Sequence, residues 1–157
     1  MRPVDSTCDP ALVLPTPAQL TAAQGVPAGA PVGEAVHRVV DDALAELAER
    51  AEPRTRRLDL SPDEFGRVLA GEDRNHEEAP LARIFPRAER LALFAVTLGP
   101  RPEARMDELF AAGDYPRAVA LDTAASLAAD ALVRRLEDDL AVEAAPAAVL
   151  AYSPGYC

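Results

Sequence analysis

The chain has 157 residues, enough for one domain with a hydrophobic core, and its formal net charge is −10 at pH 7. So acidic a chain lacks the basic patch that nucleic acids and anionic membranes require, and we expect neither as a partner. Cys8 and Cys157 match no disulfide or zinc pattern, and the lack of a signal peptide or a long apolar run predicts a soluble cytoplasmic protein.

The N-terminal part of the sequence changes character at residue 33. Residues 1–32 are rich in proline and are predicted to form an arm lying over a single domain that spans residues 33–157. Apolar residues recur at helical spacing over residues 33–51, and Pro53 stops the pattern, so we expect an amphipathic helix there. The weak alternation over residues 54–60 is typical of an edge strand.

A capping box marks the next helix. Ser61 and Glu64 flank Pro62 in the order of a helix N-terminus, which predicts a short helix ending near Gly71. A charged loop and another short helix are expected before residue 86. The continuous apolar run LALFAVTL at residues 91–98 then predicts an interior strand that is covered on both faces.

The C-terminal part is predicted to be mainly helical. A helix over residues 102–112 should end at Gly113, and a long alanine-rich helix should follow over residues 116–142. Residues 147–151 look like a closing strand. These elements together predict an α+β domain in which a small antiparallel or mixed sheet packs with helices.

Sequence motifs of the common catalytic sites are absent. The chain contains no dinucleotide fingerprint, no phosphate loop and no nucleophile elbow. His37 and Asp41 have a spacing that can hold a metal, but both are expected on an exposed helix face, and His76 is expected in a charged loop. We therefore predict neither a catalytic residue nor a metal ligand.

Asp122 is the carboxylate that the pattern places among small side chains. Its neighbours on the helix surface are alanine and serine residues at positions 118, 125, 126 and 129, so it is predicted to be buried where another group comes close. Two interpretations stay open. The carboxylate caps a neighbouring turn, or it helps to shape a ligand cleft.

The chain closes on a turn that suits a flat, polar ligand. Ser153, Pro154, Gly155 and Tyr156 follow a short apolar segment. Proline fixes φ, glycine lets another group approach the backbone, and tyrosine offers a ring and a hydroxyl. These four residues are the predicted ligand-binding site, with Asp122 or the turn at residues 97–99 beside them.

An ordered set of segments resembles a known family. The set comprises the helix over residues 33–51, Leu93-Phe94-Ala95-Val96-Thr97-Leu98-Gly99, Gly113-Asp114-Tyr115 with Ala118, Leu121-Asp122 with Ser126, and the closing Ser153-Pro154-Gly155-Tyr156. In order and spacing, over about residues 10–157, it resembles the activation domain of cobalamin-dependent methionine synthase in a free-standing version.

The resemblance implies a binding module of a methyltransferase system. Members of the family bind S-adenosylmethionine (SAM) and dock on a corrinoid or cobalamin carrier, whose inactive Co(II) centre is reduced and methylated again. It implies SAM at residues 153–156, cobalamin supplied by a partner protein or domain, and a flavodoxin-like or ferredoxin electron donor that acts indirectly.

Two departures from the family pattern bear on this expectation. The family motif is Arg-x-x-x-Gly-Tyr, and the arginine position is Ala151 here, which removes a charge-assisted hydrogen bond to the SAM carboxylate. The sequence also ends at Cys157, directly on the motif, where family members continue. A truncated fragment and a degenerate relative are both open interpretations.

Three functions therefore remain open from the sequence. The first is the SAM-binding accessory module. The second is a non-catalytic corrinoid-protein-binding protein that has lost SAM binding, and the third is a helical scaffold that binds a partner through its long alanine-rich helix.

Overall fold

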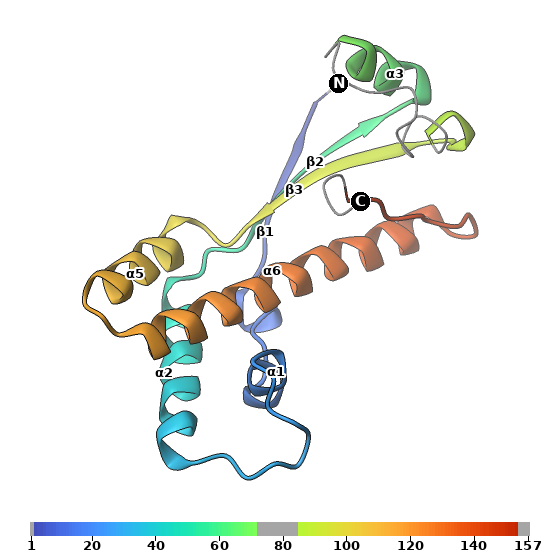
Figure 1. Cartoon of the computed structure of the whole chain (residues 1–157). Coiled ribbons are helices and arrows are strands. Elements are labelled where there is room, and N and C mark those ends of the chain that lie inside the picture. The colour runs from blue at the N-terminus through green and yellow to red at the C-terminus, as the bar shows by residue number, and fades with distance from the viewer. Residues whose placement is uncertain (1, 72–84, 154–157) are drawn as a thin grey trace. The chain divides into compact units, whose positions relative to one another are not determined.

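The computed structural model describes residues 2–71 and 85–153, whose contacts divide the chain into two compact units. The sheet unit comprises the described parts of Met1–Ser6, Thr55–Ala95 and Val149–Cys157, and the helical unit comprises Thr7–Arg54 and Val96–Ala148. The fold is α+β, as predicted, with an antiparallel sheet and one long helix (Figure 1).

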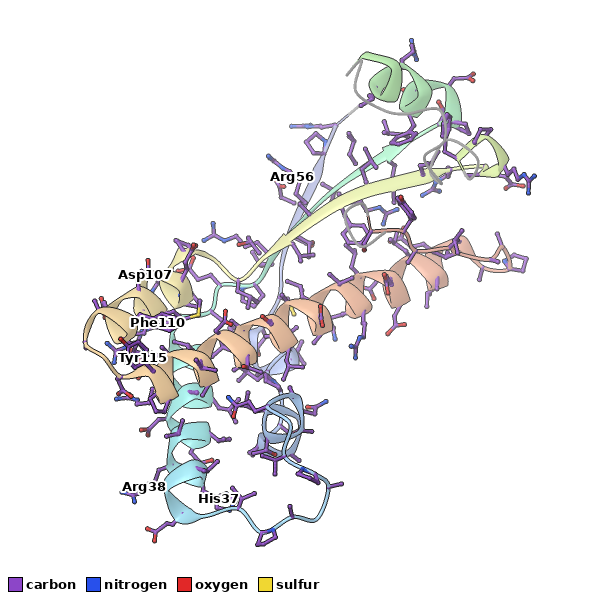
Figure 2. The ribbon with its side chains drawn as sticks, in the orientation of Figure 1. His37, Arg38, Arg56, Asp107, Phe110 and Tyr115 are labelled. Carbon is purple, nitrogen blue, oxygen red and sulfur yellow. The ribbon has the colours of Figure 1, made fainter. Side chains whose placement is uncertain are left out.

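The sheet has three strands among the described residues: β1 (Val4–Thr7), β2 (Arg54–Leu60) and β3 (Leu91–Thr97), in the order β1-β2-β3. Asp5 and Arg56 fix the register of the first pair, because the Arg56 Nε donates to Asp5 Oδ1 at 2.7 Å. Cross-strand pairs of opposite charge are a normal source of sheet stability. Figure 2 labels Arg56, which belongs to β2.

Two strand predictions were wrong in detail. Residues 54–60 form the middle strand of the described sheet and not an edge, because the N-terminal segment contributes β1. Residues 91–97 form a strand as predicted, but it lies at an edge of that sheet, and Leu93 and Ala95 are exposed between half-buried neighbours. Such alternation is what a sheet covered on one face produces.

Helix α3 (Pro62–Gly71) follows β2 in the sheet unit, and its predicted capping box is confirmed. The Ser61 backbone N–H donates to Glu64 Oε2 at 2.9 Å, and the Glu64 N–H donates to Ser61 Oγ at 3.2 Å. Phe65 is buried and meets Phe85 of the short helix η2 (Phe85–Arg87) edge to face, with ring centroids 5.2 Å apart.

The helical unit is built from α1 (Pro17–Ala23), α2 (Glu34–Arg50), α5 (Pro100–Ala111) and α6 (Tyr115–Ala144), with a short helix η1 (Pro10–Leu12) before them. Helix α6 packs against α1, α2 and α5 (Figure 1). Val13 and Leu20, from the proline-rich segment, are buried in the same core. That segment therefore contributes core residues and regular structure to the helical unit.

Helix α6 runs two residues beyond the C-terminal bound predicted for it and starts one residue earlier. Leu121 and Leu132 are buried on it, and four of its seven buried residues are alanines. The fully buried alanines are Ala118, Ala120, Ala124 and Ala128. Because alanine has the smallest side chain of these apolar residues, α6 can approach its neighbours closely.

The closing strand was also predicted wrongly, and two apolar residues of the predicted helices are exposed. Residues 147–151 form no strand, since they are mostly alanine, which has low strand propensity, and Val149 and Leu150 are exposed. Val36 and Phe110 lie within the two helices predicted over residues 33–51 and 102–112, and both are exposed. The short helix expected before residue 86 falls largely outside the described residues.

Candidate functional site

The predicted ligand turn is described only at its first residue. Ser153 is exposed and lies in irregular backbone, and so does Ala151 two residues earlier. Pro154, Gly155 and Tyr156 lie outside the described residues. Ser153 belongs to the sheet unit and Asp122 to the helical unit, and each is described within its own unit.

The prediction that Asp122 is buried was wrong. The residue is exposed on α6, although Leu121 before it is fully buried. Successive residues on an α-helix are rotated by about 100°, so the face that buries Leu121 turns Asp122 toward solvent. The small residues at positions 125 and 129 are half-buried, and they lie between the buried stripe and the exposed face. Asp122 can therefore contact a ligand or partner only from the surface.

The turn at Thr97, Leu98 and Gly99 has a well-defined geometry. The Gly99 N–H donates to Thr97 Oγ1 at 3.0 Å, and the Glu52 N–H donates to the Leu98 carbonyl at 2.8 Å. Gly99 has φ +81°, and a Cβ there would lie 3.3 Å from the Cβ of Glu52. Glycine is therefore required at the end of this motif both by backbone conformation and by the closeness of Glu52.

The second motif turn joins α5 to α6. Gly113 has φ +76°, its N–H donates to the Phe110 carbonyl at 3.1 Å, and the Asp114 N–H donates to the Leu109 carbonyl at 2.9 Å. These two bonds form a Schellman motif, which ends a helix with glycine in the left-handed region. The predicted end of the helix at Gly113 is confirmed, and the turn sets the position of Tyr115.

Sequence reasoning missed an ion network around Glu46 of α2. Arg105 of α5 donates from Nε to Glu46 Oε2 at 2.6 Å, and Arg117 of α6 donates from its guanidinium to Glu46 Oε1. The Glu46 side chain is 13% exposed. Asp42 lies 3.7 Å from Arg117 as well. The charged residues of this network come from three helices. The sequence shows only the i, i+4 spacing of Asp42 and Glu46 within α2, and no local pattern links them to Arg105 or Arg117.

The electrostatics of this network do not suit acid–base catalysis. The hydrogen bond from Arg105 lowers the pKa of the Glu46 carboxyl below its ordinary value of 4.5, and the charges of Arg105, Arg117 and Arg50 act in the same direction. A general acid or base needs a pKa near the working pH. Glu46 is therefore a charged structural link between α2, α5 and α6.

An exposed aromatic pair was also missed. Phe110, near the end of α5, and Tyr115, at the start of α6, are 43% and 61% exposed, with ring centroids 6.2 Å apart. Figure 2 shows both beside Asp107, where α5 meets α6. No local pattern identified this pair, because helical spacing does not say whether Phe110 or the buried Leu109 before it faces the core.

The described residues contain no cluster of three or more histidine, cysteine, aspartate or glutamate side chains that could hold a metal ion. His37 and Asp41 are exposed, as expected, and Figure 2 shows His37 and Arg38 near the start of α2. Cys8 is half-buried and donates from Sγ to the Asp9 carbonyl at 3.4 Å. In the described part of the chain, no helix is both long and apolar enough to cross a membrane.

No protein-family model matches the chain, and the search of curated proteins returned no match. The function is therefore proposed from the ordered motifs of the sequence, from the resemblance that they carry and from the geometry of the described residues.

Proposed function

We propose that this protein is an accessory module that binds SAM at Ser153–Tyr156 and docks on a corrinoid carrier, supporting the return of inactive Co(II) cobalamin to its methylated form. Cobalamin, bound to the partner, supplies the methyl-transfer chemistry. The chain contributes binding and orientation, which is the usual division of labour between a protein and such a cofactor.

The observation that carries the proposal is the backbone role of the motif glycines. Gly99 and Gly113 belong to segments on which the family resemblance rests, and each adopts a positive φ that side-chain-bearing residues rarely adopt. Both motif segments are therefore turns at which glycine is favoured. Together with the ordered resemblance along the chain, they support the proposal that the closing Ser-Pro-Gly-Tyr segment is the family's ligand motif.

The fit to SAM is partial in the described residues. Ser153 is exposed and offers a hydroxyl, but Ala151 offers no cation for the SAM carboxylate. A hydrogen bond to a charged group contributes about 1.5–3 kcal/mol, so the loss of this contact lowers affinity by about one to two decades. Arg134 and Arg135 are both exposed and are the alternative cations by residue type.

A reactivation assay tests this proposal. A cobalamin-loaded carrier domain in the Co(II) state is mixed with a reduced flavodoxin-like donor and SAM, with and without the chain. The donor would supply one electron to the carrier's cobalamin and SAM would supply the methyl group, with S-adenosylhomocysteine as the product, while the chain would bind SAM and orient it toward the carrier. We expect the chain to accelerate the change in the cobalamin absorbance spectrum. An identical rate without the chain contradicts the proposal.

The alternative is a corrinoid-protein-binding or scaffold protein that has lost SAM. Ala151 favours it, and so does Asp122, which is exposed and therefore builds no buried ligand site. A pull-down with the cobalamin-loaded carrier separates the two forms of this alternative. Retention of the chain without any response to SAM supports the carrier-binding form, and no retention supports the scaffold.

A further inference from the structure

We propose that an exposed face at the junction of α5 and α6, here called the aromatic corner and formed by Phe110, Tyr115 and Val119, docks a protein surface that presents arginine or lysine side chains around an apolar centre. The inference rests on the proposed function, since we take that surface to belong to the corrinoid carrier.

The apolar part of the aromatic corner is exposed within the described structure. Phe110, Tyr115 and Val119 are 43%, 61% and 49% exposed. Val119 follows Tyr115 by one helical turn and so lies on the same face of α6. Tyrosine and phenylalanine side chains at the centre of an interface commonly provide much of its binding energy.

The two rings are held in place by the backbone. The Schellman motif at Gly113 fixes how α5 leads into α6, and it brings Phe110 and Tyr115 to a centroid distance of 6.2 Å with planes inclined by 54°. The surface is therefore preorganised, which reduces the entropy that binding would otherwise cost.

The charges around the aromatic corner identify the chemistry of its partner. Glu103 and Asp107 lie seven and three residues before Phe110 on α5, and Asp122 lies seven residues after Tyr115 on α6. These spacings place each carboxylate on the face of its neighbouring ring. All three are exposed, and the described residues provide none of them with a hydrogen bond or an ion pair. The rim is therefore acidic and not neutralised within this part of the structure.

The nearby basic side chains are directed elsewhere. Arg105 and Arg117, on the same two helices, bind Glu46 of α2. Arg101 lies 3.9 Å from Glu52. A partner that brings arginine or lysine can pair with the free carboxylates and stack its cations on the two rings. An acidic partner would be repelled by the same rim, which makes this face selective.

Binding of the full chain to the cobalamin-loaded carrier tests the inference, with the equilibrium measured by biolayer interferometry. Phe110→Ala and Tyr115→Ala should each weaken binding about tenfold or more, as central aromatic contacts do. Both side chains are exposed, so melting temperatures should stay near the wild-type value. Val36→Ala is the matched control, because Val36 is 41% exposed on α2 of the same unit, and it should bind like the wild type.

A charge variant tests the rim. Glu103→Gln combined with Asp107→Asn should lower the association rate several-fold and reduce its dependence on salt. Asp41→Asn, which removes an exposed carboxylate from α2, should change neither. The SAM titration of every variant should match the wild type.

The outcomes separate this inference from the proposed function. If the wild type binds the carrier and both alanine variants bind it with the same affinity as the wild type, the aromatic corner is not the docking face. The proposed function then stands. If the wild type binds SAM but not the carrier, the docking inference fails together with the carrier-docking part of the proposed function, and the SAM-binding part stands. If it binds neither, the proposed function fails, and the inference fails with it.

Discussion

Glu46 is the charged residue on which the packing of the helical unit depends most directly. Its carboxylate accepts hydrogen bonds from Arg105 and Arg117, and truncation would leave both guanidinium groups without this partner. We expect Glu46→Gln to reduce the free energy of unfolding at pH 7 by about 1–2 kcal/mol, a value lowered for solvent screening. Glu49→Gln, which removes an exposed partner of Arg50, should change it by less than about 0.5 kcal/mol.

The stabilisation that Glu46 gives to the folded state should decrease as the pH falls. Arg105 lowers the pKa of this carboxyl in the folded state from its ordinary value of 4.5, so the unfolded state binds the proton more readily. The stabilisation is fully present above that ordinary value and is lost as the pH falls through the lower folded value. Urea unfolding of wild type and Glu46→Gln between pH 7 and pH 3 should therefore converge at the acid end, and a constant difference would contradict this explanation.

Gly99 provides a second test at a single position. Gly99→Ala places a Cβ 3.3 Å from Glu52 Cβ and forces alanine to a φ of +81°. We expect a loss of about 1–3 kcal/mol in unfolding free energy. Gly66→Ala is the control, because its Cβ would lie at an ordinary 3.5 Å from Phe85 and the position is helical. Gly66→Ala should raise the free energy of unfolding by up to about 1 kcal/mol. Equal changes in unfolding free energy for the two variants would show that position 99 does not require glycine.

The alanine surface of α6 predicts a specific response to larger side chains. Ala124 is fully buried where α6 packs with other helices, so Ala124→Leu must displace its neighbours. Inserting such volume into a packed core costs about 1–3 kcal/mol. Ala141→Leu, on the exposed side of the same helix, should change stability by less than about 0.5 kcal/mol. Thermal unfolding followed by circular dichroism compares the two, and a tolerated Ala124→Leu would mean that the helices are loosely packed.

The helices could be predicted from the sequence because their signals are local. Apolar spacing, the Ser61–Glu64 capping box and the stop at Gly113 each lie within a few residues. The capping box of α1, formed by Thr16 and Gln19, has the same type of signal and was overlooked. The order of strands could not be predicted in this way, because β1 and β2 pair across about fifty residues and nothing local records which segments meet.

The candidate sites show the same limit. The closing turn stays a prediction, because Pro154, Gly155 and Tyr156 lie outside the described residues. The burial of Asp122 was misjudged because helical spacing does not say which of several faces meets the core. The Glu46 network joins three helices and has no local pattern. The exposed pair of Phe110 and Tyr115 depends on the turn at Gly113, so it became visible only with the backbone path.

The net charge of the whole chain predicts how it meets its partners. At −10 the protein repels acidic proteins, and flavodoxins are generally acidic, so direct steering toward such a donor would be poor. The carrier should present a basic surface, and its association should slow as salt rises toward physiological strength, where charges beyond about 8–10 Å are screened. Stopped-flow association across this salt range checks the prediction. If the association rate stays constant or rises with salt, the acidic residues do not steer the carrier and contribute only to solubility.

Calorimetric titration with SAM tests the central claim most directly. We predict saturable binding at one site of the wild type, loss of binding in Tyr156→Ala with an unchanged melting temperature, and about tenfold tighter binding in Ala151→Arg, which restores the missing cation. The absence of binding by the wild type at millimolar SAM, or equal affinity of wild type and Tyr156→Ala, would contradict the account.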